Sequence, residues 1–538
     1  MGFGIAIFGV MLPGLISCSA EPSPADSEQG SGAVDSEWVD TAEEVVLERI
    51  ELYPQRISVE PGAQMMLRAV GVYSDGHREG LPELELSSGD AALSVDGLTV
   101  SALQAGSVVV SAELDGVVGE SLIEIEDTHT LHLQVIYQDT QGVPGARVIW
   151  RGEKLIADEY GAIELPTETG GPVSFTVFAQ DADFVPQTVY GVVSRRVSLT
   201  LSHIDSILPP AELSASVDFS ALDKADPDEL RLSLSGTALG GSPVLVSELD
   251  LIRSNREVTL FGASVELPEN LAIDEHASEI ALASTQEQTQ VWTMAGTLPI
   301  SDLSSGVDNF GQIGALLAAW EPTMRLDESA TVAGDGSLAI TPSGLAEDQV
   351  WVTLPDAPES SLVLLYGASE SGWLLQGLAT GSGQVRIPSP VTDQEQVVVT
   401  WREQGGAGSG SGRSMTMAPV TSGEALLPDW VQAPSHGGLS AATGDFALNT
   451  DPEAVYVRAV VQSANGALRE VLMPPGEQAA SLAGDPAMSL GKTLWDVRVI
   501  HADSHHYQDI LGSVGVVSTW AQENAVAVGG LRVEIFGE

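Results

Sequence analysis

Cysteine is almost absent from this 538-residue sequence, because Cys18 is the only one. A single thiol excludes an internal disulfide, and it excludes a metal site built from several cysteines. Basic residues are scarce too, with 22 Lys and Arg against 75 Asp and Glu and a net charge of −53. Nucleic-acid binding needs Lys and Arg clustered on phosphates, so this balance excludes DNA and RNA as partners.

Familiar catalytic motifs are missing as well. The sequence has no G-x-S-x-G turn for a nucleophilic serine, no GxxxxGK[ST] phosphate loop and no GxGxxG after a strand. Acidic residues are spread along the whole chain, so no pair of them stands out as the two carboxylates of a glycosidase. We therefore predict that the protein is not an enzyme and that it has no cofactor.

The N-terminus is an apolar run, MGFGIAIFGVMLPGLI, too short for a spanning helix of about 20 residues. It has the length of a signal-peptide core. The next residues complete a Leu15-Ile16-Ser17-Cys18 sequence, which resembles the lipobox of bacterial lipoproteins. The resemblance implies a signal peptide over residues 1–17, cleavage before Cys18, and an anchor of lipid chains on that cysteine.

Residues 18–44 are small, polar and acidic, with no apolar period. A segment of this composition cannot bury enough apolar surface to fold, so we predict a flexible acidic tether. Ser19 follows the cysteine, and by resemblance to enterobacterial lipoproteins this favours the outer membrane. The predicted location is thus an exported, lipid-anchored protein on the periplasmic face or the cell surface.

Residues 45–127 alternate apolar and polar residues between Gly-Asp, Asp-Gly and Pro-Gly turns, as in a β-sandwich. They resemble the bacterial Ig-like domain of group 2, which implies a structural or adhesive module. The residues that carry this resemblance are Ile50 to Pro54, Glu60-Pro61-Gly62, Val72 to Gly76, Ser87-Ser88, Asp90, Ala105-Gly106 and Val108 to Ala112. Leu86 stands where that family often has a core Trp.

Residues 128–204 resemble the carboxypeptidase regulatory-like, transthyretin-like sandwich, which implies a non-catalytic spacer. The residues that carry this second resemblance are Asp139, Gly142 to Ala146, Val148, Asp158, Gly161 and Val173 to Val177. Ile207 to Pro210 reads as a stiff linker. The fold class predicted for the chain is mostly β, with tandem β-sandwich domains and a short helix in the C-terminal region.

Residues 211–402 keep the β pattern but resemble no family, and we predict one or more β-rich domains there. A helix is expected at 309–320, where Ile313, Leu316, Leu317 and Trp320 follow helical spacing before Pro322. Residues 403–414, EQGGAGSGSGRS, have the composition of a flexible linker. They would separate a last β-rich domain over residues 415–538.

One cluster has the composition of a metal site, and its members are His501, Asp503, His505 and His506. In an extended chain His501, Asp503 and His505 would share one face, and imidazole with carboxylate binds zinc or related metals. The alternative is a polar loop after the strand TLWDVRVI. A second group, DKADPDE with Asp223, Asp226, Asp228 and Glu229, is either a calcium site or a solvated acidic loop.

Most tryptophans in the unassigned part stand beside aliphatic strand residues, which favours core positions, and the alternative is a glycan-binding face. They are Trp292, Trp351, Trp373, Trp401, Trp430, Trp495 and Trp520. The main functional hypothesis is a non-enzymatic lipoprotein for adhesion or scaffolding, bound to the membrane through its anchor and to an envelope protein or polysaccharide. The alternatives are a polysaccharide-binding or other ligand-binding lipoprotein acting through residues 211–538, and a metal-dependent enzyme centred on residues 501–506.

Overall fold

Short strands with alternating exposure make up most of the chain, which confirms the predicted mostly β class of tandem sandwiches. The computed structural model describes residues 45–535 with gaps. Outside the description are residues 1–44, 138–140, 168–169, 182, 204–211, 222–227, 240–241, 246–254, 261–262, 284–287, 300–323, 332–337, 342–347, 355–360, 390–394, 405–410, 428–429, 440–444, 464, 482–492, 503, 513–524 and 536–538. The lipobox, the tether, the linker at 207–210 and the helix expected at 309–320 therefore lie outside the described residues.

The first sandwich covers residues 47–125. Its strands are β1 (Leu47–Tyr53), β2 (Arg56–Val59), β3 (Gln64–Met66), β4 (Arg68–Tyr73), β5 (Arg78–Gly80), β6 (Leu86–Ser87), β7 (Leu93–Asp96), β8 (Thr99–Ala102), β9 (Gly106–Leu114) and β10 (Val117–Ile125). They form three sheets, β1-β4-β5, β2-β10-β9-β6 and β3-β8-β7. Leu52, Val110 and Ile123 from these sheets are buried in one apolar core.

The second sandwich covers residues 130–200. Its strands are β11 (Thr130–Ile136), β12 (Arg147–Trp150), β13 (Glu153–Ile156), β14 (Ala162–Pro166), β15 (Val173–Phe178), β16 (Gln187–Val192) and β17 (Arg196–Thr200). If its seven strands are counted from 1, one sheet has the order 4-1-7 and the other 3-2-5-6. Strand 1 pairs antiparallel with strand 4 and parallel with strand 7.

The third sandwich, residues 212–340, repeats this order with one extra hairpin. Its strands are β18 (Glu212–Val217), β19 (Glu229–Thr237), β20 (Asn255–Leu260), β21 (Ala263–Pro268), β22 (Leu271–Ile273), β23 (Glu279–Ala283), β24 (Gln288–Pro299), β25 (Met324–Thr331) and β26 (Leu338–Ile340). The sheets are β23-β18-β26 and β22-β19-β24-β25, and β20 pairs only with β21 among the described strands. With that hairpin set aside, the orders are again 4-1-7 and 3-2-5-6.

The fourth sandwich, residues 348–426, has the same order without insertion. Its strands are β27 (Asp348–Thr353), β28 (Ser361–Ser369), β29 (Gly372–Gly381), β30 (Gln384–Ser389), β31 (Gln396–Gln404), β32 (Ser411–Pro419) and β33 (Glu424–Leu426). Its sheets are β30-β27-β33 and β29-β28-β31-β32. Val352, Leu365 and Ile387 are buried between the two sheets.

The fifth sandwich, residues 435–535, has counterparts of six of the seven strands and one further strand that pairs differently. Its strands are β34 (Ser435–Leu439), β35 (Asp445–Asn449), β36 (Tyr456–Ser463), β37 (Leu468–Met473), β38 (Glu477–Ser481), β39 (Thr493–His501) and β40 (Ala527–Ile535). The larger sheet is β37-β36-β39-β40, as in the other copies, and β34 lies antiparallel beside β35 in the place of a parallel seventh strand. The short helix α3 (Tyr507–Gly512) stands between β39 and β40.

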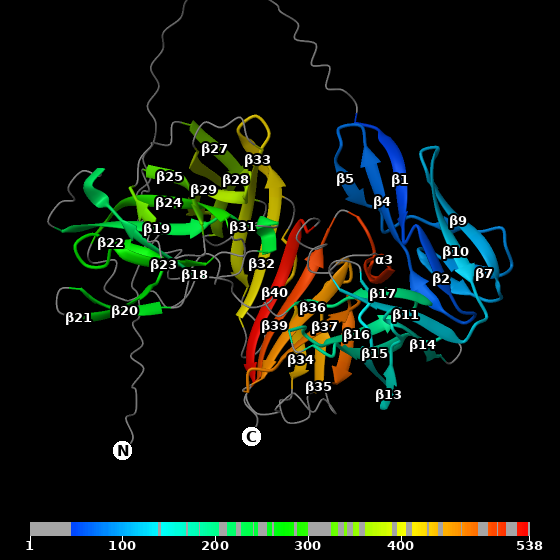
Figure 1. Cartoon of the computed structure of the whole chain (residues 1–538). Helices are drawn as coiled ribbons and strands as arrows, with labels where there is room; N and C mark the ends of the chain where they lie inside the picture. Colours follow the sequence, from blue (N-terminus) through cyan, green and yellow to red (C-terminus); the bar gives the residue numbers. More distant parts are fainter. Residues whose placement is uncertain are drawn as a thin grey trace, which may run out of the picture. The chain divides into compact units, whose positions relative to one another are not determined.

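Three of these larger sheets are joined edge to edge into one twelve-stranded sheet (Figure 1). β16 of the second sandwich pairs parallel with β37 of the fifth, and β40 of the fifth pairs antiparallel with β32 of the fourth. Sandwiches distant in sequence are therefore neighbours in this sheet.

The predicted linker at 403–414 differs from what the structure contains. Glu403 and Gln404 end β31 and pair with Arg413 and Gly412 of β32, so residues 405–410 connect two adjacent strands of the fourth sandwich. The boundary between the fourth and fifth sandwiches follows β33, after Leu426. Gly and Ser runs favour flexible turns within a hairpin as well as linkers between domains, and composition alone does not separate the two.

Candidate functional site

The predicted histidine cluster does not lie on one extended strand. β39 ends at His501, and the chain turns before α3 begins at Tyr507, while Asp503 lies outside the described residues. Among the described residues, no three His, Cys, Asp or Glu side chains gather at a potential metal site. His501 places Nε2 3.9 Å from Oδ2 of Asp451, and burial lowers its pKa to about 4.

His505 and His506 contact other parts of the chain. The His505 ring stacks on Tyr53 of the first sandwich, with ring centroids 5.6 Å apart. Nδ1 of His506 accepts a 3.2 Å hydrogen bond from the backbone N–H of Gln508, and burial lowers the His506 pKa to about 4. An imidazole that accepts through Nδ1 is neutral at that nitrogen. The structure thus assigns both side chains packing roles.

The other candidates have mixed outcomes. The lipobox residues Leu15, Ile16, Ser17 and Cys18 lie outside the described part, as do Asp223, Asp226 and Trp520. Asp228 is exposed in a turn, and Glu229 begins β19. Trp292, Trp401 and Trp495 are buried, Trp373 and Trp430 are half-buried, and Trp351 is exposed.

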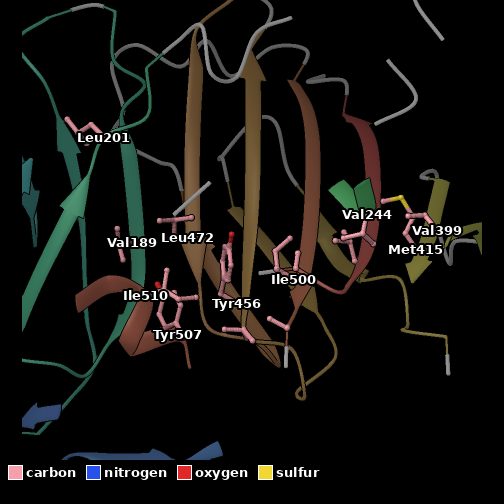
Figure 2. Close-up of a cluster of buried hydrophobic side chains, with 14 of the residues drawn as sticks. Val189, Leu201, Val244, Val399, Met415, Tyr456, Leu472, Ile500, Tyr507 and Ile510 are labelled. Atoms are coloured by element: carbon pink, nitrogen blue, oxygen red, sulfur yellow. The ribbon is translucent and has the colours of Figure 1, made fainter. Parts of the chain in front are cut away.

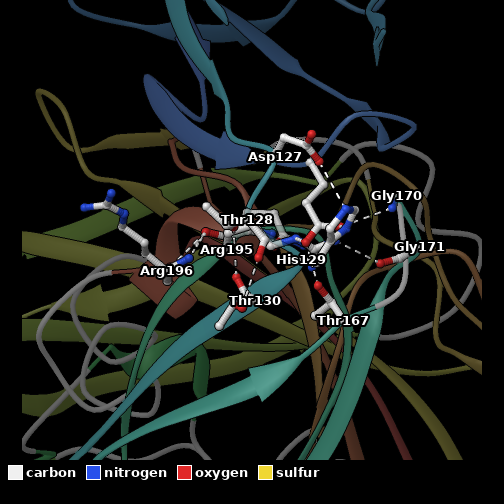
Figure 3. A network of polar contacts seen from close by, with 12 residues as sticks. Asp127, Thr128, His129, Thr130, Thr167, Gly170, Gly171, Arg195 and Arg196 are labelled. Atoms are coloured by element: carbon white, nitrogen blue, oxygen red, sulfur yellow. Dashed lines mark hydrogen bonds and ion pairs between the residues drawn. The ribbon is translucent and has the colours of Figure 1, made fainter. Parts of the chain in front are cut away.

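Three joints between sandwiches stand out, and the first is a buried ion pair. Glu60 of the first sandwich lies 3.1 Å from Nε of Arg195 in the second, and both side chains are fully buried. Thr167 and the backbone N–H of Gly170 also donate to the Glu60 carboxylate, at 2.5 and 3.3 Å (Figure 3). Burial lowers the pKa of Arg195 and Glu60 opposes that shift. We call this set the Glu60 joint.

The local chain shape explains how Glu60 reaches that position. Gly62 follows in a turn with φ of +88°, and Gly170 has φ of +73°. A Cβ on Gly170 would lie 2.5 Å from the backbone carbon of Gly62, so the two segments approach closely because residue 170 is glycine. The backbone N–H of Arg195 also donates to the carbonyl of Ser58 at 2.8 Å.

The second joint surrounds Glu470, whose side chain is fully buried where β16 meets β37. Its carboxylate accepts from Nε of Arg458 at 2.6 Å, from the Gln187 amide at 2.7 Å and from the Ser202 hydroxyl at 2.8 Å. Gln187 and Ser202 belong to the second sandwich region, and Arg458 belongs to the fifth. Arg458 therefore neutralises the charge of Glu470 from the fifth sandwich, and Gln187 and Ser202 donate hydrogen bonds to its carboxylate from the second sandwich region. We call this set the Glu470 joint.

The third joint is the α3 segment, residues 504–512. The Gln508 amide donates to the carbonyl of Gly191 at 2.9 Å and accepts from the N–H groups of Val193 and Ser194 at 3.1 and 3.2 Å. The Tyr507 hydroxyl donates to the carbonyl of Tyr190 at 2.7 Å. Tyr507 and Ile510 are buried near Val189 of the second sandwich (Figure 2).

Sequence reasoning missed all three joints. Glu60 was noticed only as part of the Glu-Pro-Gly turn of the Ig-like resemblance. One signal was available, because Arg195-Arg196 is an adjacent basic pair in a chain with 22 basic residues, and such a pair next to a strand invites a search for buried acids. Gln508 gives no comparable signal, since its partners are backbone groups about 315 residues earlier in the chain.

Within the described residues, no helix is long and apolar enough to cross a membrane. No family model and no curated protein matches the chain. The resemblances of residues 45–127 and 128–204 accordingly stay predictions.

Solved structures give weak matches. Domains 5–6 of the S-layer protein SbsC share 12% identity, with a TM-score of 0.14 over 47% of this chain and 91% of that one. The Bacillus anthracis TIE protein shares 9% identity, with a TM-score of 0.13 over 71% of this chain and 70% of that one. Domains 4–9 of SbsC share 8% identity, with a TM-score of 0.18 over 92% of this chain and 82% of that one. At such identities and TM-scores, these likenesses carry no argument about function.

Proposed function

We propose that this chain is a non-enzymatic cell-surface module, exported and anchored through a lipidated Cys18, that acts in adhesion or in scaffolding of the cell envelope. In this proposal the acidic tether of residues 18–44 spans the distance from the lipid to the first sandwich. The five sandwiches then hold their outward faces at fixed positions relative to one another. Its partners are a membrane, through the anchor, and an envelope protein or polysaccharide.

The Glu470 joint supports one part of the proposal, namely that the sandwiches keep a fixed arrangement. A buried ion pair is a weak source of stability, because desolvation of both charges offsets most of their attraction. Its best-attested benefit is to specify one arrangement over others. Here both partners of the ion pair belong to the fifth sandwich, and the hydrogen bonds that cross the joint come to Glu470 from Gln187 and Ser202 of the second sandwich region. Pairing of β16 with β37 therefore supplies hydrogen bonds to a buried charge, which favours this pairing over others. A set of independent modules on flexible linkers has no use for such a contact.

Membrane fractionation of cells that express the wild type or Cys18→Ala tests the anchored location. We expect the wild type in the membrane fraction and the Cys18→Ala chain in a soluble fraction. Ser27→Ala, a change within the predicted tether, is the matched control and should behave as the wild type. Equal solubility of the wild type and Cys18→Ala would show that the lipobox resemblance is accidental.

A second measurement addresses the side of the membrane. Protease added to intact cells should remove the wild-type chain if it is displayed outside, while a periplasmic marker protein stays intact. Full protection of the chain in intact cells, with cleavage after the outer membrane is opened, would restrict the module to the periplasm and remove adhesion to external partners.

A further inference from the structure

The outward face of the sheet β30-β27-β33 in the fourth sandwich carries an unusual set of side chains. Its exposed residues are Trp351, Thr353, Gln384, Arg386, Glu424 and Leu426, which we call the Trp351 face. Trp351 is on the central strand, where its register partners are Arg386 on β30 and Glu424 on β33. The Arg386 guanidinium lies 5.7 Å from the centre of the Trp351 ring.

Trp351 is 40% exposed and Leu426 is 74% exposed. Trp351 is also the one tryptophan in the described part of the chain that falls in the exposed class. The opposite face of the same sheet already supplies the core, through Val350, Val352 and Ile387. Packing of the fourth sandwich therefore does not account for an aromatic ring on the outside.

The other three copies of this topology show that the fold does not need an aromatic residue at this place. On the matching central strands, the outward residues are Thr130, His132 and Gln134 in the second sandwich, Ser214 and Ser216 in the third, and Asp445, Ala447 and Asn449 in the fifth. All are small or polar. Trp351 and Leu426 on the adjacent strand therefore form an exposed apolar surface that the fold does not require, and such a surface favours a binding site.

Charge decides what kind of partner fits. The chain as a whole has a net charge of −53, but the charged residues of the Trp351 face are one Arg and one Glu, which cancel. An anionic polymer would be repelled by the rest of the chain, and a cationic one would find a stronger site almost anywhere else. The face suits an uncharged ligand with apolar C–H surfaces and many hydroxyl groups.

We propose that the Trp351 face binds a neutral polysaccharide. The Trp351 ring stacks on the C–H face of a sugar ring, Arg386 donates hydrogen bonds to ring hydroxyls, and Glu424 and Gln384 accept hydrogen bonds from them. The exposed residues lie on three neighbouring strands of one sheet, so the site fits an extended chain better than a single sugar. This inference rests on the polysaccharide partner of the proposed function and names its class, but it does not depend on the lipid anchor.

Affinity electrophoresis of the purified Cys18→Ala chain tests the proposal, with laminarin, xylan, dextran and hydroxyethyl cellulose as neutral probes and alginate as the polyanion. We expect at least one neutral probe to slow the chain, and Trp351→Ala to weaken that binding at least about tenfold. Trp351→Phe should restore part of the effect, because it restores an aromatic face.

Tyr160→Ala is the matched control, since Tyr160 is 69% exposed on the second sandwich, away from the Trp351 face. It should leave the migration unchanged, and the near-ultraviolet circular dichroism of Trp351→Ala should show an intact fold. The proposal is overturned if no neutral probe slows the chain, if only alginate does, or if Trp351→Ala and Tyr160→Ala have the same effect. Because the assay uses soluble protein, its result is independent of where the wild type is located in the cell.

Discussion

Glu60 shows most clearly what a single residue does in this protein. It carries a full charge into a site with no exposed surface, and Arg195 balances that charge. Exposed pairs such as Arg56 with Glu124 have the same chemistry, but solvent screens them, and they contribute little. The difference in burial, rather than in partner type, separates a structural ion pair from a surface one.

We predict that Glu60→Gln weakens the local stability of the Glu60 joint by about 3–5 kcal/mol, because it leaves Arg195 charged and buried without a counterion. Hydrogen exchange of the Arg195 amide, which donates to Ser58, measures the effect. Glu124→Gln is the matched control, and it should cost under about 1 kcal/mol. Equal effects of the two changes would mean that the Glu60–Arg195 pair contributes no more than a surface pair.

His506 and Asp509 give the α3 segment two opposite responses to pH. Burial lowers the pKa of His506 from 6.5 to about 4, so its contribution to stability is complete above pH 6.5 and is lost as pH falls toward 4. Burial raises the pKa of Asp509 from 3.8 to about 7, so its contribution is complete below 3.8 and is lost as pH rises through 7. Between pH 7 and pH 4 the two contributions oppose each other.

Single substitutions should therefore separate them. Between pH 6.5 and 4, Asp509→Asn removes the aspartate response and leaves those of His501, His505 and His506, whose pKa values are lowered by burial. The exchange protection of residues 507–511 should therefore fall at least about tenfold more than in the wild type. His506→Gln removes the His506 response, and on acidification the protection should rise relative to that of the wild type. Protection factors corrected for intrinsic exchange measure both. If the two variants follow the wild-type pH profile, the side chains do not titrate as described.

At the scale of one element, α3 docks against the end of β16 and the residues that follow it. The helix has six residues, and little of its stability can come from its own hydrogen bonds. Its docking depends on burial of Tyr507 and Ile510 and on the Gln508 amide, which satisfies one carbonyl and two N–H groups of the second sandwich region.

Gln508→Glu tests that docking with almost no change in shape. A carboxylate accepts from Val193 and Ser194 but cannot donate to the carbonyl of Gly191, so we expect a loss of about 1–3 kcal/mol. Exchange protection of the Tyr507 to Leu511 amides is the readout. Gln462→Glu, an exposed position on β36, should have no effect there. Unchanged protection in Gln508→Glu would assign the docking to the apolar contacts alone.

At the scale of the whole molecule, a shared sheet joins sandwiches that the sequence predicts as tandem domains separated by linkers. Residues 405–410 connect β31 to β32 inside the fourth sandwich, and β32 continues through β40 into the fifth. A break in the chain between residues 405 and 410 would therefore fall between two paired strands of one sheet, and not at a boundary between two domains.

A protease site inserted within residues 405–410 tests this arrangement. After cleavage, we expect the two fragments to elute together in size-exclusion chromatography without denaturant and to separate in urea. A cleavage site inserted in residues 19–39 is the control, and its N-terminal fragment should separate at once. Separation of the fragments cut at 405–410 under native conditions would instead support the prediction that residues 403–414 link two separate domains.

The sequence alone determined the class of this protein and many of its strands. Alternation of apolar and polar residues predicted TLWDVRVIH as a strand, and β39 covers Thr493–His501 with its buried residues in alternation. Such patterns are local, because successive side chains point to opposite faces of a sheet. The β class of residues 211–538 followed from the same rule, although no family resemblance was available there.

Only the tertiary structure decided which strands are neighbours. The repeated 4-1-7 and 3-2-5-6 orders, the shared twelve-stranded sheet and the three joints all depend on pairings between residues far apart in the chain. An apolar alternating strand fits many partners equally well, so the sequence of one strand does not specify the next. The position of Trp351 shows the same limit: its aliphatic neighbours predicted a core residue, and only the register of β27 placed it on the outer face. A side chain's type fixes what it can bind, and the pairing of its strand fixes whether it meets the core, another sandwich or solvent.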